Sequence, residues 1–132
     1  GSAGTAFQWA SHAEEALKAS SPASVAKYLA RLERDLVKAR DLARMPIDTS
    51  LRAELAAMAS KLRASPGSLS SLEGQISALL KRASLESALL SRFDRAGAAQ
   101  RAALRVAIEG LEASNKLGKA LSSALSKAMN FG

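Results

Sequence analysis

The apolar residues of this chain recur at alternating spacings of four and three, and this pattern constrains the fold more than any other feature. The longest run of this kind consists of Val25, Leu29, Leu32, Leu36, Ala39 and Ala43. The same spacing returns in Leu51, Leu55, Met58 and Leu62. Residues at these intervals lie along one stripe of an α-helix, and such a stripe is buried against helices that run lengthwise beside it. The repeat therefore predicts a helical bundle.

The composition leaves no material for a sheet. The 132 residues include 29 alanines and 20 leucines, but only three valines, three isoleucines, three phenylalanines, one tryptophan and one tyrosine. Alanine and leucine favour helices, whereas strands depend on β-branched and aromatic residues. There is no cysteine, so disulfides and thiolate metal sites are excluded, and no apolar run is long enough to span a bilayer. We expect an all-α fold with a single core.

Serine–proline segments divide the chain into helices. A first helix is expected over about 5–19. The second starts with Ser21 as its N-cap and Pro22 at its first helical position, where proline is tolerated. It ends before the Met-Pro pair at 45–46, because the residue before a proline is pushed out of the helical region. The third helix carries the stripe over 51–62.

A second serine–proline break, Ser-Pro-Gly-Ser at 65–68, precedes the fourth helix. The spacing of Ser70 and Glu73 fits a capping box, in which each residue satisfies a backbone N–H of the first turn. The apolar pattern continues to Phe93, and Gly97 marks the next break.

Short loops between these helices predict antiparallel neighbours. We expect residues 1–2 to be a tag remnant, 3–93 to form an up-down-up-down four-helix bundle, and 94–132 to add one or two helices packed on it. The fifth helix is expected over about 98–112, and a last helix after Ser114. The apolar stripe expected for the fifth helix consists of Leu104, Ile108 and Leu111.

The net charge of +7 is unevenly distributed. Residues 1–60 carry eight basic and seven acidic residues, whereas residues 61–132 carry eleven and five. Such a basic half favours an anionic partner, and a solubilising surface is the other interpretation. Nucleic-acid binders commonly add aromatic rings for stacking or clustered arginines for phosphates. Because aromatic residues are few and the arginines are dispersed, this chain fits that class poorly.

Side chains suited to catalysis are scarce. The single histidine, His12, has no second histidine at helical spacing, so we interpret it as a surface or packing residue. Glu33 and Asp35 are two positions apart and therefore diverge on a helix. There is no nucleophile elbow and no glycine-rich phosphate loop. The sequence predicts no enzyme, no cofactor, no metal and no small-molecule substrate.

One end of the expected bundle combines two loops with several basic residues. The loop between the first two helices and the loop between the third and fourth lie at the same end of an up-down bundle. No acid occurs within 18–28 or within 61–72. The candidate site residues at this tip are Lys18, Lys27, Lys61, Arg63 and Leu69, the last of which we expect to be exposed. Each cation near an anionic membrane contributes about 1 kcal/mol. The structural alternative is that helix ends are often basic.

This arrangement resembles the four-helix-bundle membrane-localisation domains of large bacterial toxins and type III secreted effectors, including the lipid-raft-targeting domain of the Bordetella effector. The segment 24–29, Ser-Val-Ala-Lys-Tyr-Leu, is similar to the start of the corresponding toxin helix, and the resemblance covers about 5–93. It implies that the loops at one bundle tip contact anionic phospholipid head groups. Residues 94–132 have no counterpart.

A competing resemblance is to the helix-turn-helix of phage-repressor-type DNA-binding domains. The matching positions within 59–75 are Ala59, Leu62, Ser65, Leu69, Ser70, Leu72 and Glu73. Arg63 stands where that family prefers glycine in the turn. The expected recognition helix offers no arginine or asparagine for bidentate contacts with base edges.

A third possibility lies in the last helix. Lys116 and Lys119, together with Leu117, Leu121 and other apolar residues, resemble a basic amphipathic helix that lies on a membrane or docks on a partner. Core packing explains the same leucines.

We therefore expect a non-enzymatic targeting module that attaches a bacterial toxin or effector to an anionic phospholipid membrane. The expected location is the host cell, after secretion, at the periphery of the host membrane; the alternative is the cytoplasm. The two other functions that remain open are DNA binding through 59–75 and docking to a protein partner or secretion chaperone.

Overall fold

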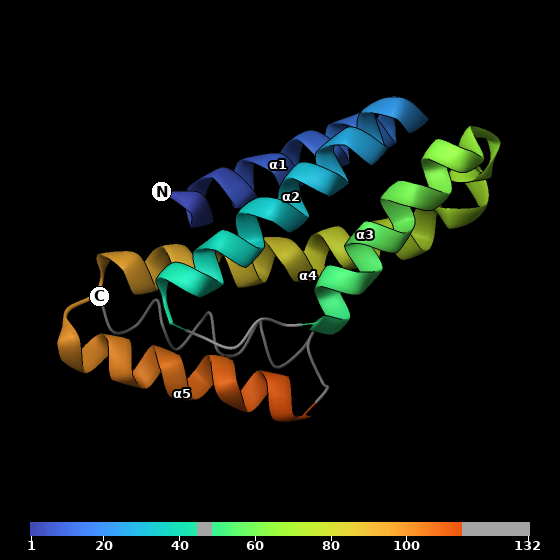
Figure 1. The fold of residues 1–132 in the computed structure, drawn as a ribbon. Coiled ribbons are helices and arrows are strands. Elements are labelled where there is room, and N and C mark those ends of the chain that lie inside the picture. Colours follow the sequence, from blue (N-terminus) through green and yellow to red (C-terminus); the bar gives the residue numbers. More distant parts are fainter. Residues whose placement is uncertain (45–48, 115–132) are drawn as a thin grey trace.

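The chain folds into α-helices joined by short turns (Figure 1). The computed structural model describes residues 1–44 and 49–114. In this part the helices are α1 (Ser2–Lys18), α2 (Pro22–Leu42), α3 (Thr49–Ala64), α4 (Leu69–Arg95) and α5 (Ala98–Ser114), with a 3-10 turn, η1 (Pro66–Ser68), before α4. The described residues contain no strand. The all-α class predicted from composition and periodicity is confirmed.

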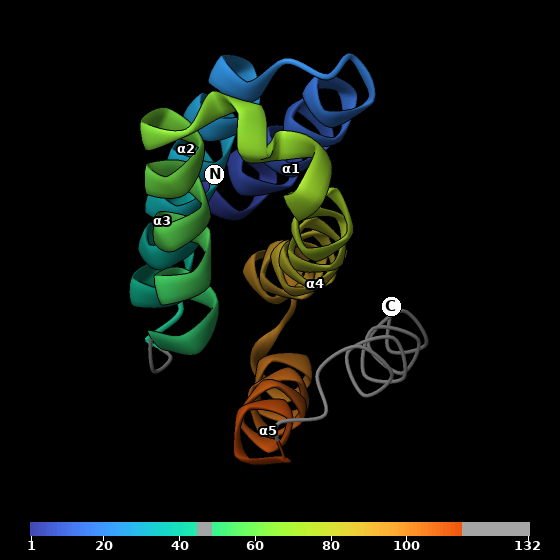
Figure 2. The ribbon, with the colours of Figure 1, turned by 90° about the vertical axis from the view of Figure 1, so that its right-hand side faces the viewer.

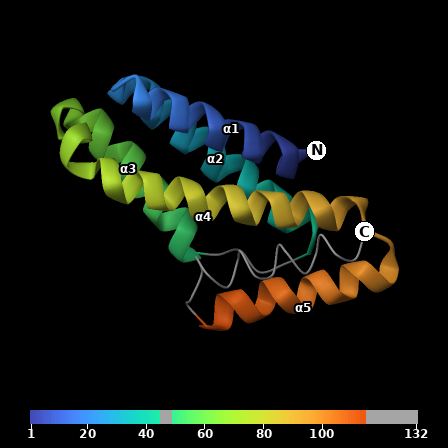
Figure 3. The same ribbon diagram turned by 180° about the vertical axis from the view of Figure 1, so that it is seen from behind.

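The first four helices alternate in direction and pack as a splayed bundle. α1 packs against α2 and α4, and α2 also packs against α3. Seen from the end that carries both tight loops, α3 and α4 diverge below η1 (Figure 2). α5 packs against α4, on the side away from α1 (Figures 2 and 3). The two tight loops therefore share one end of the molecule.

The core consists of the stripes that the spacing predicts. All six residues of the 25–43 stripe are buried, as are Leu51, Leu55 and Leu62 of α3, whereas Met58 is half-buried. In α4 the buried stripe includes Leu72, Ile76, Leu79 and Ala83, and Leu104 anchors α5. In α1 the buried face is almost entirely alanine, with Ala3, Ala6, Ala10, Ala13, Ala16 and Leu17. Alanine lets neighbouring helices approach closely because it has no side chain beyond Cβ.

Most helix boundaries agree with those predicted from the serine–proline segments. α1 begins at Ser2, three residues before the expected start. Ser21 is the N-cap of α2 and Pro22 its first residue, as predicted, although the Ser21 side chain makes no capping hydrogen bond. The break at Gly97 separates α4 from α5.

Two helices end in a left-handed residue that is not glycine. Ser20 has φ 54° and Arg44 has φ 55°. After α1, the N–H of Ser20 donates to the carbonyl of Leu17 at 3.1 Å, and the N–H of Ser21 donates to that of Ala16 at 3.1 Å. This is the Schellman arrangement, in which glycine usually occupies the left-handed position because it has no Cβ. Both turns therefore carry backbone strain.

An ion pair lies inside the bundle between α2 and α4. Arg40 is 1% exposed and pairs with Glu86, which is 2% exposed. The neighbouring Ser87 is fully buried, and its Oγ has no hydrogen-bond partner. Burying two charges costs several kcal/mol of desolvation for each ion, and each charge of this pair is compensated by the attraction of the other.

Two arginines of α5 attach this helix to the ends of α2 and α4. Arg105 donates to the carbonyls of Arg44 at 3.0 Å and of Ala43 at 3.2 Å. Arg101 donates to the carbonyl of Phe93 at 3.3 Å, and both guanidinium groups lie over the Phe93 ring. These bonds satisfy carbonyls that a helix C-terminus leaves without partners.

Some sequence predictions fall outside the described residues. These are the Met-Pro segment at 45–46, the last helix after Ser114, and the side chains of Ile108 and Leu111. Within the described part of the chain, no helix combines the length and hydrophobicity that a membrane crossing requires.

Candidate functional site

The two tight loops meet in a small cleft at one end of the bundle. Ser20 comes from the α1–α2 loop, Pro22 is the first residue of α2, and Pro66 and Gly67 come from η1. Figure 2 shows that the two connections lie at the same end. The cleft has a volume of about 230 Å³ and is also lined by Leu69, Ser70 and Glu73 from the first turns of α4. We call this region, residues 18–24 and 61–73, the tip.

The four predicted basic residues are all exposed, but they do not form one cluster. Lys18 lies in the last turn of α1, and Lys61 and Arg63 lie in the last turn of α3, so these three border the tip. Lys27 stands further along α2, where its Nζ lies 5.7 Å from the centre of the Tyr28 ring. None of the four lines the cleft itself.

The expectation that Leu69 is exposed is wrong. Leu69 is 6% exposed and belongs to the core. The turn η1 runs directly into α4, so Leu69 is in helical phase with Leu72 and Ile76 and faces the same side. It forms the floor of the tip cleft and does not project from the tip.

The predicted capping box of Ser70 and Glu73 does not form. The N-cap of α4 is Ser68, in helical conformation, and no side chain caps this end. Instead Ser68 Oγ donates to the carbonyl of Ser65 at 2.7 Å, and Ser71 Oγ donates to that of Ser68 at 2.9 Å. Because η1 already supplies a helical turn, α4 begins one residue before Ser70, and Ser70 lies inside the helix.

The two helix N-termini at the tip lack acidic residues and capping side chains. Neither α2 nor α4 has an acidic residue in its first turn or a side chain that caps it. Helix N-termini carry partial positive charge and N–H groups without partners within the helix, which favours anions. The C-termini of α1 and α3 lie at the same end and carry partial negative charge, so the four helix dipoles largely cancel there, and the net positive charge of the tip comes from Lys18, Lys61 and Arg63.

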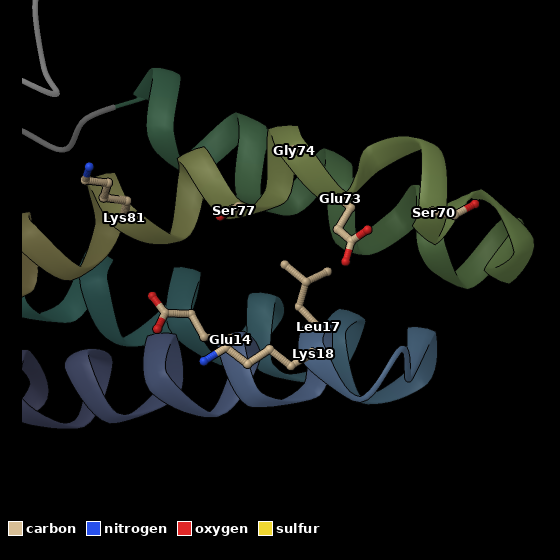
Figure 4. A pocket seen from close by; sticks show the side chains of 8 residues that line it. All are labelled: Glu14, Leu17, Lys18, Ser70, Glu73, Gly74, Ser77 and Lys81. Atoms are coloured by element: carbon tan, nitrogen blue, oxygen red, sulfur yellow. The ribbon is translucent and has the colours of Figure 1, made fainter.

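A longer groove runs from the tip between α1 and α4 (Figure 4). Its volume is about 740 Å³, and its lining residues are Glu14, Leu17, Lys18, Ser70, Glu73, Gly74, Ser77 and Lys81. In Figure 4 the Glu73 carboxylate and the Leu17 side chain point toward each other across the groove, whereas Lys81 points away from α1. Glu73 and Ser70 line both the groove and the tip cleft.

Sequence reasoning missed Glu73 as a member of the tip. The acid-free range 61–72 stops one residue before Glu73. Glu73 lies one helical turn after Leu69 and lines the tip cleft, so the tip is a mixed-charge surface with more cations than acids. The sequence contains this information, because Glu73 is three positions after Ser70 and four after Leu69, and residues at these spacings are neighbours on the surface of a helix.

Sequence reasoning also missed an aromatic cluster on the α1–α2 face. The only tryptophan, histidine and tyrosine of the chain gather there, with the Trp9 and Tyr28 rings stacked 5.9 Å apart and His12 5.5 Å from Tyr28. Trp9 Nε1 donates to Asp35 Oδ2 at 2.5 Å, and the Arg31 guanidinium lies 4.9 Å from the Trp9 ring centre. His12 is an exposed residue at the edge of this cluster, with a side chain that is 50% exposed.

The helix-turn-helix candidate, 59–75, corresponds to the end of α3, η1 and the first turns of α4. Its second helix continues to Arg95, and the exposed side chains of its first two turns include Ser70, Ser71, Glu73 and Gln75. No basic side chain is available there for base edges. Among the described residues, no three His, Asp or Glu side chains are placed to hold a metal ion.

Comparison with known proteins identifies no relative. No protein family, no curated protein and no solved structure matches this chain. The function must therefore be argued from the tip and the surfaces around it.

Proposed function

We propose that this protein is a non-enzymatic targeting module that attaches to anionic phospholipid membranes through the tip. The observation that carries the proposal is the shared cleft of the two tight loops, which brings the ends of all four bundle helices to one surface. Exposed Lys18, Lys61 and Arg63 surround that surface. The resemblance to membrane-localisation domains supports a bacterial toxin or effector as the parent protein.

The expected binding strength follows from the charges. Three cations at the tip and Lys27 nearby contribute about 1 kcal/mol each at an anionic membrane surface, or about 4 kcal/mol together, and Glu73 opposes them by about one such contribution. The remaining attraction is weak, so attachment should need anionic lipid and should fall as salt screens the charges. A module of this strength suits a protein that has further membrane contacts.

The experiment is co-sedimentation with vesicles of phosphatidylcholine, alone or mixed with phosphatidylglycerol. We expect pelleting only with the anionic lipid, and its loss in the double variant Lys18→Glu/Lys61→Glu. The matched control is Lys38→Glu/Arg95→Glu, which makes the same charge change on exposed residues at the far end of the bundle. Equal losses in both variants would indicate attraction by net charge and not by the tip.

Absence of wild-type pelleting at physiological salt would refute the proposal. A binding test with duplex DNA and a pull-down with protein partners then distinguish the two alternative functions. DNA binding that depends on 59–75 would support the helix-turn-helix interpretation, and a partner captured by both charge variants would support docking.

A further inference from the structure

Glu73 is the acid that lines both hollows at the tip. It borders the small cleft between the loops and the longer groove between α1 and α4. Its carboxylate points into the groove toward α1 (Figure 4). Among the described residues it takes part in no ion pair. Its charge is therefore open to whatever enters these hollows.

The Glu73 carboxylate would weaken the binding of a simple anion at this site. At a separation of about 4 Å in water, a unit charge repels a phosphate enough to weaken binding about fivefold. The neighbouring Lys18 supplies the opposite charge in the same groove. The two groups lie on opposite walls, however, and the Lys18 side chain extends along α1 toward Glu14 and away from Glu73 (Figure 4).

The hollows also have room beside Glu73. Gly74 is the sixth residue of α4, and a Cβ at that position would meet no atom within 4 Å. Glycine inside a helix costs up to about 1 kcal/mol relative to alanine, and here no neighbouring side chain requires it. The missing side chain leaves the groove wall open next to the carboxylate.

We infer that the tip recognises a phospholipid head group that carries an ammonium group beside its phosphate, with Glu73 binding the ammonium and the exposed cations around the tip binding the phosphate. This inference rests on the proposed function, because it names the lipid that the same tip prefers. An ammonium donates hydrogen bonds to a carboxylate, and a charge-assisted bond of this kind is about twice as strong as a neutral one. A head group with both charges converts Glu73 from a repulsive group into a binding group.

The experiment compares two vesicle types of equal net charge. Phosphatidylcholine is mixed with the same mole fraction of either phosphatidylserine, which has the ammonium group, or phosphatidylglycerol, which lacks it. We expect the wild type to bind the serine lipid several-fold more tightly. In Glu73→Gln, binding to phosphatidylglycerol should rise about fivefold because the repulsion is gone, and the preference for phosphatidylserine should disappear.

The matched control is Glu15→Gln, which removes the same charge from an exposed residue of α1 outside both hollows. It should change binding to the two lipids by the same factor. Circular dichroism verifies that both variants keep the helical content of the wild type.

The outcomes separate the inference from the proposed function. If the wild type binds both anionic vesicles equally and Glu73→Gln raises both by one factor, the tip is a general anion site, so the inference is wrong and the proposed function stands. If the wild type binds neither vesicle, the proposed function and the inference both fail.

Discussion

The buried pair of Arg40 and Glu86 leads to a prediction about stability in which the double variant is more stable than either single variant. Replacing Glu86 with leucine leaves a guanidinium that is 1% exposed without its carboxylate. Leaving such a charge uncompensated costs about 3–5 kcal/mol, whereas replacing both partners with apolar residues of similar volume is neutral or stabilising. We therefore expect Glu86→Leu and Arg40→Met each to destabilise strongly, and the double variant to recover most or all of the loss.

The magnitude makes the test sensitive. A domain of this size unfolds with about 5–15 kcal/mol, so either single variant removes a large share of its stability. The coupling energy of the double-mutant cycle should be at least about 3 kcal/mol. The assay is urea unfolding followed by circular dichroism, with the fluorescence of Trp9 as a second probe. Coincident transitions from the two probes justify the two-state treatment.

The control is the more exposed pair of Arg82 and Glu54, in which the Glu54 side chain is 52% exposed. Because exposed pairs contribute about 0–1 kcal/mol, Glu54→Leu should have little effect. The reasoning is refuted if Glu86→Leu costs no more than Glu54→Leu, or if the double variant is less stable than either single variant.

Three further predictions concern other contacts. Arg44→Gly should stabilise the protein by about 0.5–1 kcal/mol in thermal unfolding, because it relieves a left-handed φ while keeping the carbonyl that accepts from Arg105; an unchanged or lower Tm would contradict the strain. Asp35→Ala should cost about 1–3 kcal/mol and shift the emission of Trp9, since the half-buried indole loses the charged acceptor of its N–H; an unaltered spectrum would show that the bond does not persist in solution. Arg105→Ala should speed amide hydrogen exchange in α5 but not in α1, because α5 loses its bonds to the end of α2; equal acceleration in both helices would mean that α5 does not open separately.

The fold was largely predictable because its core consists mostly of leucine and alanine at helical spacing. The leucine stripes of α2, α3 and α4 specify which face is buried, and the serine–proline breaks specify the order of directions. What the spacing did not reveal was the splay of α3 from α4. That divergence depends on side-chain volumes at the crossing, which periodicity does not encode.

The site was less predictable, because its important features join residues from different helices. The lipid-binding role of the four basic residues remains a prediction, and all four side chains are exposed as that role requires. The expectation that Leu69 is exposed was wrong because η1 is helical and leads directly into α4, which turns this side chain toward the core. Arg40 and Glu86 each look like ordinary solvent-facing residues in the sequence, and only the packing of α2 on α4 brings them together.

The alanine face of α1 has a consequence for how this helix can change over generations. Its buried positions, except Leu17, are already alanine, so substitution to a smaller side chain can remove no more than one methyl group at each of them. Any larger side chain must force α1 away from α2 or α4, because both lie close against it. Natural variation should therefore be permissive on the outer face of α1 and restricted to alanine, glycine and serine on its inner face. Compensating changes should be found in α2 and α4, the two helices that α1 touches.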